Sequence, residues 1–141
     1  MIDMKRYSQF LIIIFLLASN FAFSQATIEL RVSNVEINKG PILVALYNSE
    51  SSYMEVEFKA GMGESTANEV VIMFEDIPGG EYALTLFQDE NEDKELNVGM
   101  FGPKEPYAFS NNAKGTFGPA KYKDAKFKVA NEGVTVHKIT L

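Results

Sequence analysis

The sequence contains no cysteine, no tryptophan and a single histidine among its 141 residues. Without cysteine, the chain has no disulfide, no thiolate nucleophile, no zinc–thiolate site and no lipid-modified cysteine anchor. One histidine also argues against a zinc site built from imidazole ligands. No short period is sustained along the chain, which excludes collagen-like and coiled-coil folds.

The chain is rich in apolar and aromatic residues. Hydrophobic residues make up 46% of it and aromatic residues 12%. This content is enough to bury a core, so an intrinsically disordered chain is excluded. A length of 141 residues is typical of one domain.

The first 24 residues have the pattern of a secretory signal peptide. A basic pair precedes a nine-residue, mostly apolar run, and small residues stand at positions −3 and −1 of a cleavage site (Lys5-Arg6, 10–18, Ala22 and Ser24). The run is shorter than the roughly 20 apolar residues that a membrane span needs. We therefore predict a cleaved signal peptide over residues 1–24 and one domain over residues 25–141. The protein is expected to be secreted or periplasmic, with no membrane span in its mature form.

The net charge of the predicted domain limits the classes of partner that it can bind. Residues 25–141 carry 11 Lys and Arg against 18 Asp and Glu, a net charge of −7. An acidic domain repels phosphate backbones, so nucleic acid is not expected as a partner.

Alternating apolar and polar residues predict an all-β domain. Seven segments have strand character, and no window of helical length shows apolar residues at 3.6-residue spacing outside the signal peptide. Glycine-containing segments predict a hairpin or a tight β-turn at residues 78–80 and a hairpin around residues 131–133. We expect a single β-sandwich, immunoglobulin-like or transthyretin-like, with a small barrel as the alternative. The predicted strands are 28–33, 42–47, 54–59, 69–77, 81–89, 125–130 and 134–141, with an irregular connection over 60–68 and one long loop over 98–123.

An acidic segment after the fifth predicted strand resembles a calcium loop. Oxygen-bearing side chains stand at relative positions 1, 3 and 5 (Asp89, Asn91 and Asp93). Ca²⁺ takes six to eight oxygen ligands, and alternate residues of a tight loop supply them. Glu95 would add its backbone carbonyl and Asn97 a direct or water-mediated contact. The prediction is a Ca²⁺ site formed by these five residues.

The segment departs from an EF-hand in two places. Lys94 replaces the glycine of position 6, and Met100 replaces the bidentate glutamate of position 12. The alternative interpretation is a solvated acidic turn that binds no metal.

The long loop combines aromatic and amide side chains. Ordered loops of this length are often functional. We predict ligand binding by Tyr107, Phe109, Ser110, Asn111 and Asn112, with a stacking surface for a sugar or peptide to which Phe101, Phe117 and Tyr122 also contribute. The alternative is that the rings pack inward and that the polar side chains satisfy the loop's own backbone.

No catalytic constellation is evident in the sequence. His137, the only histidine, alternates with apolar residues in the last strand and is expected to face solvent. No G-x-S-x-G or G-x-x-x-x-G-K-[ST] motif occurs. A pair of acids such as Glu105 and Asp124 would be needed for acid–base chemistry, and nothing distinguishes them from surface charge.

Two long segments resemble one known family. Residues 78–97 (PGGEYALTLFQDENEDKELN) and 102–127 (GPKEPYAFSNNAKGTFGPAKYKDAKF) are similar to domain-of-unknown-function family 2141, small exported bacterial proteins. The resemblance implies a secreted β-sandwich and brings no activity with it. Family members more often have glycine near Lys94 and aspartate near Asn97, which implies a weaker calcium loop here. The matching residues are Pro78, Gly80, Tyr82, Ala83, Phe87, Asp89, Asn91, Pro103, Glu105, Tyr107, Phe109, Ser110, Asn111, Asn112, Phe117, Gly118 and Pro119.

Three functions are consistent with these observations. The first is an exported, non-catalytic binding or interaction module whose ligand is a glycan, a peptide or an envelope protein. The second is a purely structural cell-envelope protein. The third is a hydrolase that uses the acidic loop. The absence of a catalytic set favours the first.

Overall fold

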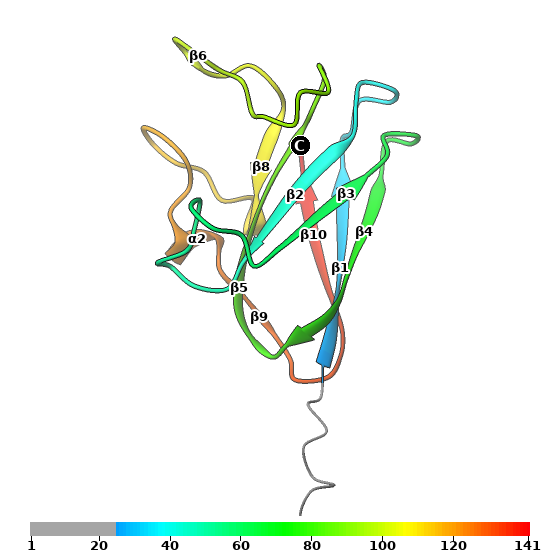
Figure 1. Cartoon of the computed structure of the whole chain (residues 1–141), viewed down its shortest axis with the longest axis vertical. Helices are drawn as coiled ribbons and strands as arrows, with labels where there is room; N and C mark the ends of the chain where they lie inside the picture. The colour runs from blue at the N-terminus through cyan, green and yellow to red at the C-terminus, as the bar shows by residue number, and fades with distance from the viewer. Residues whose placement is uncertain (1–24) are drawn as a thin grey trace, which may run out of the picture.

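The computed structural model describes residues 25–141, and the predicted signal peptide lies outside the described residues. Two β-sheets pack face to face, and loops extend from the upper end of the sandwich (Figure 1). The predicted all-β sandwich of about seven strands is confirmed. Three strands form one sheet and four form the continuous path of the other.

The three-stranded sheet has the order β10-β1-β4. Strand β1 (Gln25–Ser33) lies at its centre, antiparallel to β4 (Val70–Pro78) and parallel to β10 (Gly133–Thr140). Alternate residues of β1 are buried, as their apolar character predicts. The first and last strands of the described chain therefore lie side by side.

The second sheet has the order β3-β2-β5-β8. Its strands are β2 (Ile42–Tyr47), β3 (Lys59–Gly63), β5 (Gly80–Gln88) and β8 (Tyr107–Phe109). A further short strand, β9 (Phe127–Val129), pairs with the first residues of β5. The ladder β5–β8 carries the predicted ligand residues into the sheet, because it pairs Phe87 with Tyr107 and Thr85 with Phe109.

The inner faces of both sheets form the main hydrophobic core. Its residues are almost all Val, Ile, Leu and aromatic side chains at alternate strand positions, as expected for a sandwich. Its largest fully buried apolar members are Ile28, Leu30, Ile42, Leu46, Ile77, Leu84 and Ile139. A second, smaller cluster of Ala83, Phe109, Ala120 and Ala125 lies under the long loop. The long loop is thus packed onto the sandwich through its own core.

The predicted strand at residues 54–59 is wrong. Residues 54–58 form turns, in which the backbone N–H groups of Glu55 and Val56 both donate to the carbonyl of Ser52. Met54 has a positive φ of 64°, which an extended strand does not allow. The strand β3 lies instead within the segment predicted to be irregular. Two of its residues are glycines that place their Cα against Phe74, Ile72 and Val70, so close sheet packing, and not β-propensity, decides its position.

The hairpin predicted at residues 131–133 is wrong, and at residues 78–80 the chain makes a tight turn and not a hairpin. The turns at residues 78–80 and 131–133 do connect strands, but each passes from one sheet to the other, because β4 and β10 pair only with β1 while β5 and β9 pair in the second sheet. A Cβ on Gly79 would lie 2.1 Å from Oδ1 of Asn131, so these two connections pack against each other. A glycine turn between apolar runs specifies the change of direction but not the pairing partner.

The long segment after the acidic loop contains more structure than predicted. It forms a small hairpin of β6 (Val98–Gly99) and β7 (Gly102–Pro103), then β8, the 3₁₀ turn η1 (Ser110–Asn112) and the short helix α2 (Tyr122–Ala125). No helix within residues 25–141 has the length and apolar character that crossing a bilayer would require.

Candidate functional site

The acidic loop is organised around a buried aspartate. Asp89 is 1% exposed, and its carboxylate accepts hydrogen bonds from the backbone N–H groups of Asp93 at 3.2 Å and Lys94 at 2.8 Å. The neighbouring turn fits closely, since Gly40 has φ +91° and a Cβ there would lie 1.9 Å from the carbonyl oxygen of Asp89. This carboxylate holds the beginning of the loop in place.

Glu105 closes the same loop from the other side. It is buried, and its two carboxylate oxygens accept from the backbone N–H groups of Glu90 at 3.1 Å and Asn97 at 3.0 Å. The sequence pointed to Glu105 only as one member of an acid pair with Asp124. The structure gives Glu105 a bracing role. Asp124 takes part elsewhere, through its backbone carbonyl oxygen, which accepts from the side-chain amide of Asn111.

The tip of the acidic loop brings together three of the predicted metal ligands. The side-chain amides of Asn91 and Asn97 both donate to Oδ2 of Asp93, at 2.9 and 3.0 Å. The amide of Asn91 also donates to Oδ1 of Asn97 at 2.7 Å. These amides, with the Asn97 bond contributing most, lower the pKa of Asp93 below its usual value. Glu95 is exposed and enters the arrangement through its backbone N–H, which donates to Oδ1 of Asp93.

The donor set of this loop suits a hard cation in type, because it consists of carboxylate and amide oxygens. Its present geometry uses the carboxylate oxygens as hydrogen-bond acceptors. Within residues 25–141, no group of three or more His, Asp or Glu side chains is arranged to hold a metal ion. To bind Ca²⁺, Asn91 and Asn97 would have to turn their amide oxygens toward an ion held by the carboxylate of Asp93. Calcium binding stays a prediction.

Ser110 is completely buried at the start of η1. Its hydroxyl accepts from the backbone N–H of Leu84 at 2.9 Å and donates to the carbonyl of Ala125. It therefore joins β5, η1 and the end of α2. The sequence left two interpretations of Ser110, ligand binding and satisfaction of the loop's own backbone. These contacts favour the second.

Asn111 connects the same turn to three other segments. It has a left-handed φ of 60°, which asparagine tolerates better than most residues. Its side-chain amide donates to the carbonyls of Asp124 at 3.0 Å and Lys126 at 2.9 Å, and its backbone N–H donates to Nε2 of His137 at 3.0 Å.

His137 does not face solvent as predicted. Its ring is half-buried and stacks on Phe127, with ring centres 4.1 Å apart. Burial lowers the pKa of His137, and accepting an N–H at Nε2 also requires the neutral ring. The only histidine is thus bonded to the backbone of Asn111 rather than to a nucleophilic hydroxyl.

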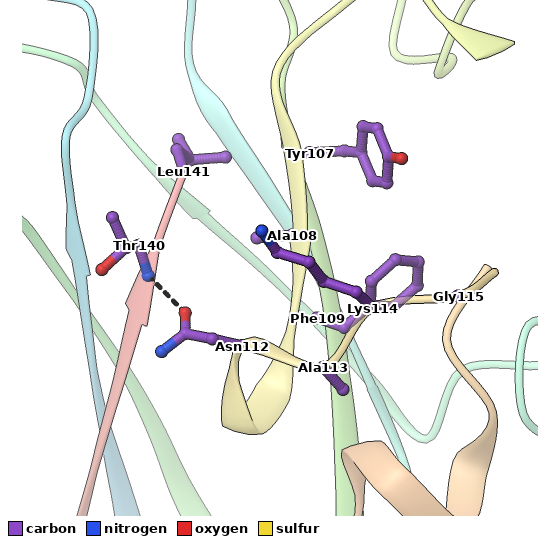
Figure 2. A pocket seen from close by; sticks show the side chains of 9 residues that line it. All are labelled: Tyr107, Ala108, Phe109, Asn112, Ala113, Lys114, Gly115, Thr140 and Leu141. Atoms are coloured by element: carbon purple, nitrogen blue, oxygen red, sulfur yellow. Dashed lines mark hydrogen bonds between the residues drawn. The ribbon is translucent and has the colours of Figure 1, made fainter.

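A cleft of about 480 Å³ lies between β8, η1 and the end of β10 (Figure 2). Asn112 forms one wall, where its Oδ1 accepts from the backbone N–H of Thr140 at 2.8 Å. Within the described residues, the Nδ2 of Asn112 has no hydrogen-bond partner. The remaining lining residues are Tyr107, Ala108, Phe109, Ala113, Lys114, Gly115 and Leu141.

Tyr107 and Lys114 give this cleft its chemical character. The ring of Tyr107 is 43% exposed and packs edge-on against Phe109, with centres 5.8 Å apart. Both rings point toward the loop that carries Gly115, and the aliphatic chain of Lys114 runs across the cleft in front of β8 (Figure 2). An aromatic face, a cation and an amide therefore border one open space.

The other aromatic residues of the long segment divide into two groups. Phe109 is buried, and Tyr122 packs with Tyr53 against the small core. Phe101 and Phe117 are fully exposed. The structure thus brings Tyr107, Phe109 and Asn112 together at one cleft, whereas Phe101 and Phe117 are not part of its lining.

Lys114 was not predicted from the sequence, because a single lysine in a loop carries no pattern of its own. Phe101 and Phe117 were predicted to contribute to a stacking surface, but the structure places them outside the cleft. Each of them is followed by Gly and Pro in the repeated triplet F-G-P at residues 101–103 and 117–119.

Comparison with known proteins gives one match. Residues 30–137 match the model of the family described as uncharacterized proteins conserved in bacteria, domain-of-unknown-function family 2141. The chain belongs to this family. The resemblance seen in the sequence is confirmed, and the match covers every strand of the sandwich in whole or in part. No curated protein and no solved structure matches the chain.

Proposed function

We propose that this member of the family is an exported, non-catalytic binding module whose ligand lies in the cleft of Tyr107, Asn112 and Lys114. The observation that carries the proposal is the convergence of an exposed aromatic ring, an amide and a cation on one open cleft. The surrounding polar groups support it, because Ser110 and Asn111 brace the cleft wall through main-chain hydrogen bonds. Rigid walls reduce the ordering cost of binding.

The chemistry of the cleft favours an acidic glycan or a peptide carboxylate. A sugar ring or a peptide side chain would pack on the ring of Tyr107. Lys114 would bind the carboxylate, and Nδ2 of Asn112 would donate to a hydroxyl or carbonyl oxygen. An envelope protein would use the same groups through an exposed acidic segment. The signal-peptide pattern places such ligands outside the cytoplasm, in the periplasm or the medium.

The proposal includes Ca²⁺ as a stabilising ligand of the acidic loop. Its support is the meeting of Asn91, Asp93 and Asn97 side chains at the loop tip. Thermal unfolding in EDTA and across a Ca²⁺ titration tests it. A rise in Tm that Asp93→Ala abolishes and Mg²⁺ does not reproduce supports calcium, because a ligand of the native state alone stabilises it. An unchanged Tm at millimolar Ca²⁺ refutes this part alone.

The cleft is tested by binding of residues 25–141 to arrays of acidic and neutral glycans and of peptides. We expect saturable binding that Tyr107→Ala and Lys114→Ala each reduce by about tenfold or more, since each loses about 1.4 kcal/mol or more of contact free energy. Lys128→Ala, an exposed lysine of β9, is the matched control and should bind like the parent.

Two outcomes contradict the proposal. Binding that is unaffected by both cleft substitutions would move the site elsewhere on the molecule. A complete lack of binding across acidic glycans, peptides and envelope extracts would favour the structural envelope protein. Turnover of any arrayed compound that is lost in Asp89→Ala with the fold intact would instead favour the hydrolase.

A further inference from the structure

Two loop tips share one sequence and one geometry. The triplet F-G-P occurs at residues 101–103, between β6 and β7, and at residues 117–119, between η1 and α2. Both phenylalanines are fully exposed, so neither ring is covered by any part of residues 25–141. Two apolar rings held entirely in water are unusual for a folded domain, where large aromatic side chains are normally buried at least in part.

The backbone explains why these rings cannot fold back. Gly102 has φ +115° and Gly118 has φ +138°, and no heavy atom lies within 4 Å of a Cβ built on either one. A positive-φ glycine reverses the chain directly after the phenylalanine, and the following proline fixes its own φ. The triplet is thus a sharp, stiff turn that presents its first side chain outward. Met100, next to Phe101, is also almost fully exposed and enlarges the first tip.

Lysines flank both tips. Residues 98–104 and 113–123 together contain four lysines, Lys104, Lys114, Lys121 and Lys123, and no acidic residue. The remainder of residues 25–141 carries a net charge of −11. Within the described residues, the ion pairs involve only Arg31 and Lys126 among the basic side chains, so these four lysines are not neutralised by an acidic partner.

The two tips extend from the same side of the sandwich. In Figure 1 the β6–β7 hairpin and the loop that precedes α2 both project toward the left, away from β1, β4 and β10. The outer face of the three-stranded sheet carries Glu29 and Glu75 together with Arg31 and Lys138, so charges of both signs lie there. The acidic loop at residues 89–97 leads directly into β6. The excess of basic charge is therefore confined to the residues that flank the two tips.

From these observations we propose that the two F-G-P tips attach the protein peripherally to a bilayer that contains anionic phospholipids. Phe101 and Phe117 enter the boundary between headgroups and acyl chains, and the flanking lysines lie against the lipid phosphates. Phenylalanine rings and lysines on one polar–apolar boundary are the composition that binds such an interface. The acidic remainder of the domain is repelled by the same surface, so the contact is limited to the two tips.

A bilayer fits these tips better than a protein partner does. A stable protein interface requires one continuous, complementary surface with a well-packed centre. Here the apolar groups are separate protrusions on two loops, and a fluid interface accommodates separate protrusions without a matching shape. Lys114 belongs to both the cleft and the second tip, but neither Phe101 nor Phe117 lines the cleft, so substitution of the two phenylalanines tests the attachment separately.

Vesicle flotation tests the proposal directly. Residues 25–141, which contain every strand, are mixed with vesicles of phosphatidylglycerol and phosphatidylethanolamine, or of phosphatidylcholine alone. We expect flotation with the anionic vesicles, weakened by salt, and a loss of about tenfold or more in the partition coefficient for the double variant Phe101→Ser/Phe117→Ser. The matched control Val71→Ser/Val136→Ser removes two exposed apolar side chains from the three-stranded sheet and should float like the parent.

The lack of tryptophan provides a second readout. Phe101→Trp and Phe117→Trp each introduce a single indole, whose emission should shift to shorter wavelength with anionic vesicles, while Val136→Trp should not shift. No flotation of the parent with anionic vesicles, or equal flotation of the double phenylalanine variant, overturns the proposal. Crosslinking of the tips to an envelope protein without any vesicle binding would also overturn it and assign the tips to a protein partner. If Phe101→Ser/Phe117→Ser no longer floats but still binds the cleft ligand, membrane attachment and the proposed function are separate properties.

Discussion

The turn at residues 110–112 and the two F-G-P tips lie in the same long segment but differ in every physical respect. The polar side chains of the turn are bonded to main-chain groups of β5, β10 and the region around α2. The phenylalanines of the tips touch nothing in the described chain. Ser110 and Asn111, which were predicted to bind a ligand, hold the fold together. Phe101 and Phe117, for which a stacking surface and inward packing were the two predictions, face water.

This contrast follows from the hydrogen-bonding requirements of the backbone at each place. A buried backbone N–H or carbonyl needs a partner, and the segment that covers β5 supplies one from Ser110 and Asn111 because no neighbouring strand does so there. The tips carry no such requirement, since their backbone is exposed. Their phenylalanines are therefore free to serve contacts outside the molecule.

The largest effect is expected from the buried aspartate of the acidic loop. Asp89→Ala should lower the free energy of unfolding by about 3 kcal/mol, because two backbone N–H groups lose charge-assisted bonds worth about 1.5–3 kcal/mol each, partly replaced by water. Urea unfolding in EDTA measures this. Glu95→Ala, which removes an exposed carboxylate of the same loop, should change stability by less than about 0.5 kcal/mol. Equal effects of the two would mean that the loop is not braced from within.

The second-largest loss of stability is expected from substitution of Asn111. Asn111→Ala removes two side-chain hydrogen bonds to carbonyls and places alanine at φ 60°, for a loss of about 2 kcal/mol. Asn111→Gly separates these causes, since glycine accepts the positive φ and lacks only the amide. We expect it to lose about 1 kcal/mol. If glycine were as costly as alanine, the backbone conformation would contribute nothing.

The stability of the protein should also depend on pH through His137. Burial lowers its folded pKa below the 6.5 of the unfolded chain, so the unfolded state binds more protons as the pH falls below about 6.5. The contribution is complete above that pH and is lost below it, because a protonated Nε2 no longer accepts the Asn111 N–H. We expect a loss of at most about 1 kcal/mol between pH 7.5 and 5. Chemical unfolding at both pH values shows it, and His137→Phe, which keeps the stacked ring, should remove this part of the pH dependence.

Tyr107 should have the smallest effect on stability among the aromatic residues of the cleft wall. Its ring is nearly half exposed and packs edge-on against Phe109, so Tyr107→Ala should cost about 0.5–1 kcal/mol in thermal unfolding. Tyr107→Phe should be neutral. A cost of several kcal/mol for Tyr107→Ala would make the residue part of the core rather than of a binding surface.

Much of the sandwich could be predicted, because the apolar residues of strands such as β1 and β2 indicate which positions are buried. The pairing of the strands could not be predicted. The glycine turns at residues 78–80 and 131–133 specify a reversal, but which strand is bonded depends on contacts distant in sequence, such as that between Gly79 and Asn131. The strand β3 was missed because glycine has low β-propensity, while its place is decided by Phe74 and Ile72 packing on it.

The candidate site, like the sheet pairing, could be predicted only in part, because it also depends on contacts between residues distant in sequence. The segment 107–112 was found from its composition, and three of its five predicted ligand residues do line one cleft. The composition could not tell which amides and hydroxyls would be used internally, because the main-chain partners of Ser110 and Asn111 lie 13 to 26 residues away in the chain. Whether an amide is available to a ligand depends on tertiary contacts.

The most direct test of the account compares urea unfolding of Ser110→Ala with that of Phe101→Ser/Phe117→Ser. The account predicts that Ser110→Ala loses about 2 kcal/mol, because the N–H of Leu84 and the carbonyl of Ala125 lose a buried partner. The double phenylalanine variant should stay within about 0.5 kcal/mol of the parent, since both rings are already in water. A double phenylalanine variant less stable than Ser110→Ala would contradict the division between bracing residues and contact residues.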